Sequence, residues 1–190
     1  MVGNTLEQEI IGLYNADMTA AYSINEIATR LKKKYPYINK KVSRLIEKKV
    51  LNKTVIGRSY LCSINLDCDE AILLLSYNDM ESKREFLGKN KKLASFLDHL
   101  DTNKKRFLIK ACVFINDVLI VVTDGSALAL AAQALKPKSQ KTMFLDEDMF
   151  LSYLVDHANK DHVVLYSFER YYEYIKEIEG KLRLKHAKIV

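Results

Sequence analysis

The chain has 190 residues, of which 48% are hydrophobic and 28% are charged, and its formal net charge is +6. This composition is that of a globular protein, and it excludes a disordered chain, a collagen-like chain and a disulfide scaffold. No apolar stretch approaches the ~20 residues that span a bilayer, and residues 1–20 lack the basic and apolar regions of a signal peptide. We therefore expect a cytoplasmic protein with no membrane partner.

The three cysteines, Cys62, Cys68 and Cys112, contain no C-x-x-C pair. A zinc site needs four ligands at close spacing, and no such set is visible. We therefore expect buried thiols, no metal and no cofactor.

The charges are distributed unevenly along the chain. Residues 25–60 contain eleven Lys and Arg against two acids, whereas residues 140–180 contain four against nine. The last ten residues add four further basic side chains. A concentrated basic block of this kind is typical of a module that faces nucleic acid.

Three helices are predicted in the first fifty residues. Apolar residues at helical spacing indicate the first helix over residues 4–17. Ser23 and Glu26 have the spacing of a capping box, which predicts the start of the second helix. We expect this helix to end at Lys34, because Pro36 disfavours helical geometry in the residue before it. Pro36 then opens the third helix, since proline is well tolerated in a first turn.

The third predicted helix has two different faces. Its buried face consists of apolar side chains: Ile38, Val42, Leu45 and Ile46. Its opposite face and flank carry basic and hydrogen-bonding side chains: Tyr37, Asn39, Lys40, Lys41, Ser43, Arg44 and Lys48. Arg44 suits bidentate hydrogen bonds to guanine and Asn39 suits adenine, whereas the lysines suit phosphates. Core packing is the alternative interpretation of Tyr37.

After Leu51 the hydrophobic period changes to two, which predicts a β-hairpin with Lys53 near its base and Arg58 at its tip. Three helices followed by a basic hairpin make a winged helix-turn-helix. Residues 23–64 resemble the DNA-binding domain of many archaeal and bacterial winged-helix regulators. The resemblance implies that the third helix enters the major groove of double-stranded DNA, while the hairpin tip, with Arg58, contacts the backbone or the minor groove. Two alternatives stay open: the basic face of the helix is simply solvated, or the winged helix binds another protein without DNA.

Two apolar-periodic stretches follow, over residues 67–90 and 91–100. They predict two helices. These helices either form the core that joins two domains or serve as a dimerisation element, and the sequence does not separate the two interpretations.

The rest of the chain predicts the order β-β-α-β-α-β-α. The expected elements cover residues 106–115, 118–123, 126–135, 141–145, 146–155, 162–166 and 168–178. Asn116-Asp117 indicates a tight turn between the first two strands. Behind a winged helix, this order resembles archaeal proteins that carry a minimal nucleotidyltransferase-like domain. Residues 141–150 and 162–172 carry the resemblance.

The catalytic signature of that family is not retained. It consists of a Gly-Ser pair after the first strand and an Asp-x-Asp motif that opens the second, which together hold nucleotide phosphates and a divalent metal. Here Ile115 is followed directly by Asn116-Asp117, and Leu119 stands where the second aspartate belongs. We therefore expect no catalytic residues and no nucleotidyl transfer.

The sequence thus predicts an α+β protein, with a winged helix-turn-helix followed by a small nucleotidyltransferase-like α/β domain. The expected domains are residues 1–66 for DNA binding, 67–102 for connection or dimerisation, 103–180 for the degenerate α/β domain and 181–190 as a basic tail. We expect a nucleoid-associated, homodimeric transcription regulator that recognises specific sequences in double-stranded DNA. A nucleotide-binding enzyme is the chief alternative, and an RNA-binding or scaffold protein is a third.

Overall fold

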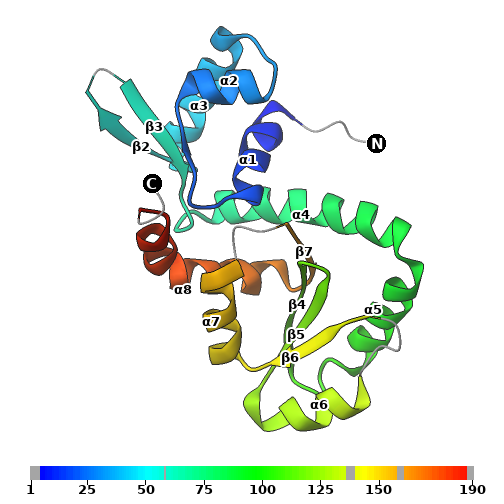
Figure 1. Cartoon of the computed structure of the whole chain (residues 1–190). Coiled ribbons are helices and arrows are strands. Elements are labelled where there is room, and N and C mark those ends of the chain that lie inside the picture. Colours follow the sequence, from blue (N-terminus) through cyan, green and yellow to red (C-terminus); the bar gives the residue numbers. More distant parts are fainter. Residues whose placement is uncertain (1–4, 58, 136–139, 158–160, 188–190) are drawn as a thin grey trace. The chain divides into compact units, whose positions relative to one another are not determined.

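The structure is a computed structural model in which the chain divides into two compact units (Figure 1). The described residues are 5–57, 59–135, 140–157 and 161–187. The first unit extends to Asn78 and includes the C-terminal end of the chain from Arg183, and the second comprises Asp79–Leu182. The boundary lies inside helix α4 (Asp69–Lys89). The division predicted after residues 66, 102 and 180 stays a prediction.

The first unit has the topology of a winged helix-turn-helix. Its elements before α4 are α1 (Leu6–Ala16), β1 (Ala21–Tyr22), α2 (Ile24–Arg30), α3 (Tyr35–Glu47), β2 (Leu51–Ile56) and β3 (Ser59–Ile64). The sheet order is β1-β3-β2, and both strand pairs are antiparallel. The three helices and the hairpin were predicted, whereas the two-residue strand β1 is too short to show any periodicity.

The core of this unit joins α1 to the sheet. Ile10, Ile11 and Tyr14 of α1 are fully buried, and the Tyr14 hydroxyl donates a hydrogen bond of 2.8 Å to the carbonyl oxygen of Cys62 in β3. Burial of the hydroxyl raises the pKa of Tyr14 far above its ordinary value. A buried polar group is thereby satisfied at the centre of the unit.

The start of α2 agrees with the sequence, but its end does not. Ser23 and Glu26 form the predicted capping box. The helix ends at Arg30 instead of Lys34, because Lys32 adopts a left-handed conformation with φ 54°. The predicted effect of Pro36 on Tyr35 is also corrected, since Tyr35 is already the first residue of α3.

The second unit is built on a four-stranded mixed sheet with the order β6-β5-β4-β7. Only the β5–β6 pair is parallel. Its elements after α4 are α5 (Lys91–Asn103), β4 (Ile109–Ile115), β5 (Val118–Thr123), the short helix η1 (Gly125–Ala127), α6 (Leu128–Ala134), β6 (Thr142–Leu145), α7 (Glu147–His157), β7 (His162–Tyr166) and α8 (Phe168–Ala187). This is the predicted β-β-α-β-α-β-α order. Helix α8 continues to Ala187, where the sequence predicted a tail after Gly180.

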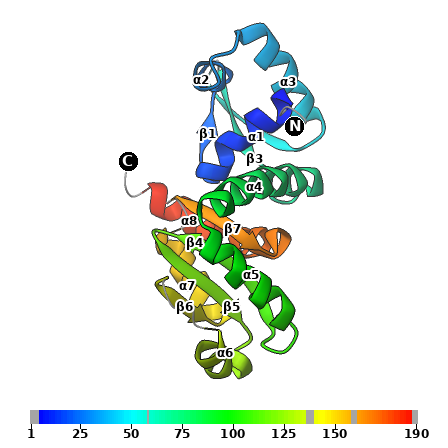
Figure 2. The same ribbon diagram turned by 90° about the vertical axis from the view of Figure 1, so that its right-hand side faces the viewer.

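Helices cover both faces of this sheet. Leu97 of α5 and Leu135 beyond α6 pack with Cys112 and Leu119 in one buried cluster. Helix α7 contacts β5 and β6 from the other face, and Figure 2 shows α7 and α5 on opposite sides of the sheet. Strand β5 is buried along its whole length, in agreement with its nearly continuous apolar sequence.

Among the residues that the structure describes, no helix is both long and apolar enough to cross a membrane.

Candidate nucleic-acid interface

Helix α3 presents the face predicted to read DNA, because its other face is fixed in the core. Ile38, Val42 and Leu45 are fully buried, while the fourth predicted core residue, Ile46, is only half-buried. Lys34 precedes the helix without a side-chain cap, and Pro36 lies in its first turn. Proline tolerates this position, since the first turn has no partners for its N–H groups.

The predicted contact residues differ in exposure. Tyr37, Lys40, Arg44, Lys48 and Lys53 are exposed, and Asn39, Lys41 and Ser43 are half-buried. Arg58 lies outside the described residues. The Tyr37 side chain is 67% exposed, so its alternative interpretation as a core residue is wrong. Lys41 is also corrected: it does not point freely outward, because its ammonium group turns toward α1.

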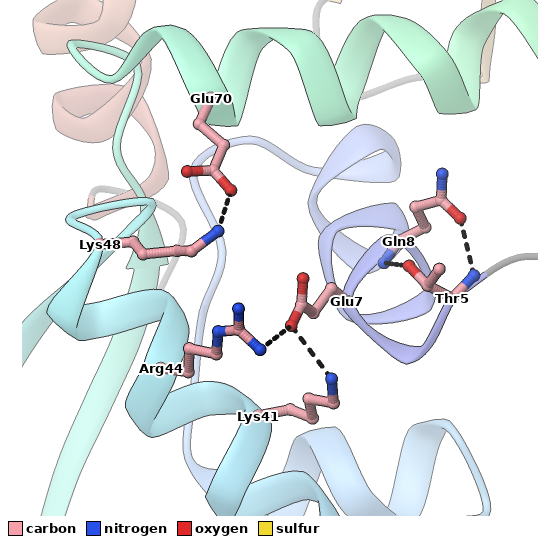
Figure 3. A network of polar contacts seen from close by, with 7 residues as sticks. All are labelled: Thr5, Glu7, Gln8, Lys41, Arg44, Lys48 and Glu70. Carbon is pink, nitrogen blue, oxygen red and sulfur yellow. Dashed lines mark hydrogen bonds and ion pairs between the residues drawn. The ribbon is translucent and has the colours of Figure 1, made fainter.

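One carboxylate of α1 binds two of the predicted DNA-contacting cations (Figure 3). Lys41 Nζ donates a hydrogen bond of 3.1 Å to Oε1 of Glu7. Arg44 Nη1 lies 3.9 Å from the same oxygen. Lys41 and Arg44 are three residues apart and therefore neighbours on the surface of α3.

A second carboxylate binds the cation at the end of α3. Lys48 Nζ lies 2.5 Å from Oε1 of Glu70, which stands in the first turn of α4 (Figure 3). Lys33, which follows α2, pairs with Glu9 of α1 at 3.4 Å. The sequence predicted neither of these two ion pairs, nor the contacts that Glu7 makes with α3. The partners lie 22 to 37 residues apart, so no local spacing connects them.

The start of α3 is the part of the helix whose charges are not neutralised. Within the described ranges, no ion-pair partner is found for Lys34 or Lys40. Both are exposed, as are Tyr35 and Tyr37, at 46% and 67%. Lys34, Tyr37 and Lys40 follow one another in steps of three residues and therefore lie along one side of the helix, a side that can contact phosphates and base edges or sugars. Neither Lys34 nor Tyr35 is among the contact residues that the sequence predicts.

The β2–β3 hairpin forms the wing. Val55 and Ile56 are 68% and 57% exposed near its tip, and Gly57 turns the chain with φ 59°. Lys53 Nζ lies 4.3 Å from the centre of the Tyr60 ring, a cation–π contact that leaves its charge at the surface.

The second unit carries acidic side chains at the turns that follow β4 and β5. Asn116 and Asp117 form the predicted tight turn, with φ of 49° and 61°. The Asp124 carboxylate accepts hydrogen bonds from the Ser126 hydroxyl and backbone N–H, which lower the pKa of Asp124, so it caps η1. Asp117 borders a cavity of about 310 Å³ together with Asp161 and His162. Across the part of the chain that the structure describes, no three His, Cys, Asp or Glu side chains are grouped to hold a metal ion.

Comparisons with known proteins do not assign the chain to a family. No protein-family model matches the sequence, and no curated protein is similar to it. MepR, a transcription regulator of the Staphylococcus aureus multidrug efflux pump MepA, has a TM-score of 0.36 with 18% identity, covering 52% of this chain and 78% of its own. The transcriptional regulator PcaV from Streptomyces coelicolor has a TM-score of 0.35 with 18% identity, covering 54% and 75%.

A third similar structure is ZitR from Lactococcus lactis, a zinc-responsive MarR family member, with a TM-score of 0.33 and 19% identity over 56% of this chain and 78% of its own. All three TM-scores are below 0.5. The winged helix is therefore identified from the order and pairing of its own elements.

Proposed function

We propose that the chain binds double-stranded DNA through α3 and the β2–β3 hairpin and acts as a transcription regulator. The observation that carries the proposal is the exposed start of α3, where Lys34, Tyr37 and Lys40 lie along one side of the helix and all reach solvent. The N-terminal residues of a recognition helix are those that reach base edges in helix-turn-helix proteins. Asn39 and Arg44 follow on the same helix and supply side chains suited to adenine and guanine.

The proposal is tested with the double variant Lys34→Ala/Lys40→Ala. Within the described residues these lysines support no ion pair, so the variant removes charge without leaving an acid uncompensated. Binding to a random-sequence duplex is measured by fluorescence anisotropy between 50 and 200 mM salt, concentrations over which phosphate contacts lose much of their affinity. We expect weaker binding and a salt slope reduced by about one unit for each lost phosphate contact.

The matched control is Lys91→Ala/Lys92→Ala, which removes two exposed lysines from α5 in the second unit. This variant should bind duplex DNA as the unmodified chain does. Equal affinity of both double variants would remove α3 from the interface. Stronger binding to structured RNA than to the duplex would favour the RNA-binding alternative.

We further propose that the second unit is a nucleotidyltransferase-like domain without catalysis, used for dimerisation or partner contact. The two hydrogen bonds that commit the Asp124 carboxylate to Ser126 support this proposal. Phosphoryl-type transfer needs a phosphate cradle and metal ligands together. Incubation with labelled nucleotide, magnesium, and protein or RNA acceptors should give no label transfer; transfer lost in Asp117→Ala would contradict the proposal.

A further inference from the structure

The contact between Glu7 and α3 has the geometry of an oxyanion site. A single carboxylate oxygen, Glu7 Oε1, accepts from Lys41 Nζ at 3.1 Å and lies 3.9 Å from Arg44 Nη1 (Figure 3). Lysine and arginine side chains on adjacent turns of one helix bind a phosphate oxygen in the same manner. Both cations keep part of their surface exposed, with 37% of the Lys41 side chain and 60% of the Arg44 side chain accessible.

Glu7 is held firmly at this position. It lies in the first turn of α1, where the helix dipole favours an anion. The capping box formed by Thr5 and Gln8 fixes this turn, with hydrogen bonds of 2.7 and 3.3 Å. The buried residues Ile10 and Ile11 anchor the next turn in the core. The Glu7 side chain is only 19% exposed, so solvent competes weakly for its carboxylate.

We propose that Glu7 is an internal competitor of the DNA backbone. Its carboxylate occupies the place of a phosphate oxygen between Lys41 and Arg44, and duplex binding exchanges the carboxylate for a phosphate. The inference rests on the proposed function, which it deepens by assigning a role to an acid on a different helix. The exchange lowers the affinity for any duplex, because Lys41 and Arg44 must first leave the Glu7 carboxylate, which is negatively charged like the phosphate that replaces it.

The chain supplies a matched control for this inference. Glu9 lies on the same helix as Glu7 and also pairs with a lysine, Lys33 Nζ, at 3.4 Å. Lys33 lies outside α3. Glu7→Gln and Glu9→Gln therefore change the net charge equally and remove one acidic partner each. Long-range attraction to DNA rises equally in both variants, so the difference between them measures the local competition.

The experiment measures the affinity of both variants for a random-sequence duplex at several salt concentrations, with thermal unfolding as a second readout. We expect Glu7→Gln to bind about fivefold more tightly than Glu9→Gln at 100 mM salt, as the loss of two partly exposed ion pairs allows. Its salt slope should be steeper by about one unit. The gain should vanish when Glu7→Gln is combined with Lys41→Ala and Arg44→Ala.

The contrary results are distinct. Equal affinities of Glu7→Gln and Glu9→Gln would overturn the inference, while the proposed function would stand as long as the unmodified chain binds. Weaker binding by Glu7→Gln with a lower melting temperature would show that Glu7 stabilises the packing of α1 on α3. That result would also overturn the inference. A complete lack of duplex binding by the unmodified chain would instead overturn the proposed function and this inference with it.

Discussion

Glu147 joins two helices of the second unit through a single oxygen. Its Oε1 accepts hydrogen bonds of 2.5 Å from the Tyr174 hydroxyl and from Arg170 Nη2, both on α8, while Glu147 itself begins α7. The hydrogen bond from Tyr174, followed by that from Arg170, lowers the pKa of Glu147 below its ordinary value of 4.5. The hydrogen bond to Glu147, followed by that to Glu173, raises the pKa of Arg170. The ionised carboxylate therefore stabilises the packing of α7 on α8.

Glu147→Gln should lower the free energy of unfolding by about 1 to 2 kcal/mol at pH 7, a range set by hydrogen bonds to charged groups and reduced for partial exposure. The folded-state pKa lies below 4.5, so the contribution is complete above pH 4.5 and is lost as the pH falls through the folded-state value. Urea unfolding of both proteins from pH 7 down through acid measures this.

The control is Glu173→Gln, which removes only an exposed i,i+3 partner of Arg170 and should cost about 0.3 kcal/mol. If Glu147→Gln and the unmodified chain lost stability in parallel on acidification, Glu147 would not be the titrating group.

At the scale of elements, the sequence predicts the starts of helices better than their ends. The start of α2 is predicted by a local pattern, the capping box formed by Ser23 and Glu26. A residue with positive φ stands two positions after the last residue of both α2 and α3, Lys32 at 54° and Lys49 at 60°. Glycine is the usual residue at this position, so a lysine there gives no stop signal.

Backbone hydrogen bonds explain why these ends hold. After α3, the N–H of Lys49 donates to Ile46 O at 2.9 Å and the N–H of Val50 donates to Leu45 O at 2.9 Å. The buried side chains of Val50 and Leu45 fix the turn in the core. Tertiary packing, which periodicity does not show, therefore overrides the preference for glycine.

The candidate interface also has one part that the sequence predicts and one part that it does not. The basic face of α3 follows from its own periodicity, and the structure confirms the exposure of Tyr37 and Lys40. The acids Glu7 and Glu70 that pair with this face come from other helices. Their positions depend on how α1 and α4 pack, and a single sequence contains no local signal for that.

Lys49→Gly should stabilise the chain relative to Lys49→Ala. Both variants remove the same charge from the end of α3, but only glycine adopts a positive φ without a Cβ penalty. The left-handed conformation costs other residues roughly 1 kcal/mol, so the two variants should differ by about that amount in urea unfolding. An alanine variant as stable as the glycine variant would show that this turn relaxes at no cost.

At the scale of the whole molecule, we expect a homodimer. One recognition helix contacts a short site, and helix-turn-helix dimers read two half-sites about one helical turn apart. In the first unit, Leu73 of helix α4 is 62% exposed. A large apolar side chain at the surface of this helix offers a contact to a second copy.

Light scattering at micromolar concentration should give the mass of a dimer, and Leu73→Lys should give that of a monomer. Leu130→Lys is the control, because Leu130 is 51% exposed on a different helix, α6, and should leave the dimer intact. A monomeric unmodified chain, with and without duplex DNA, would contradict the prediction.

The position of β4 in the second unit has a consequence for synthesis on the ribosome. β4 lies between β5, which follows it after a two-residue turn, and β7, which begins only at His162. Translation proceeds at about 5 to 20 residues per second, so one edge of β4 waits roughly 3 to 10 seconds for its partner strand to emerge. That edge belongs to an apolar strand, Ile109–Ile115, with open backbone donors and acceptors. During this interval the nascent chain exposes an unpaired apolar strand edge, which can pair with another chain.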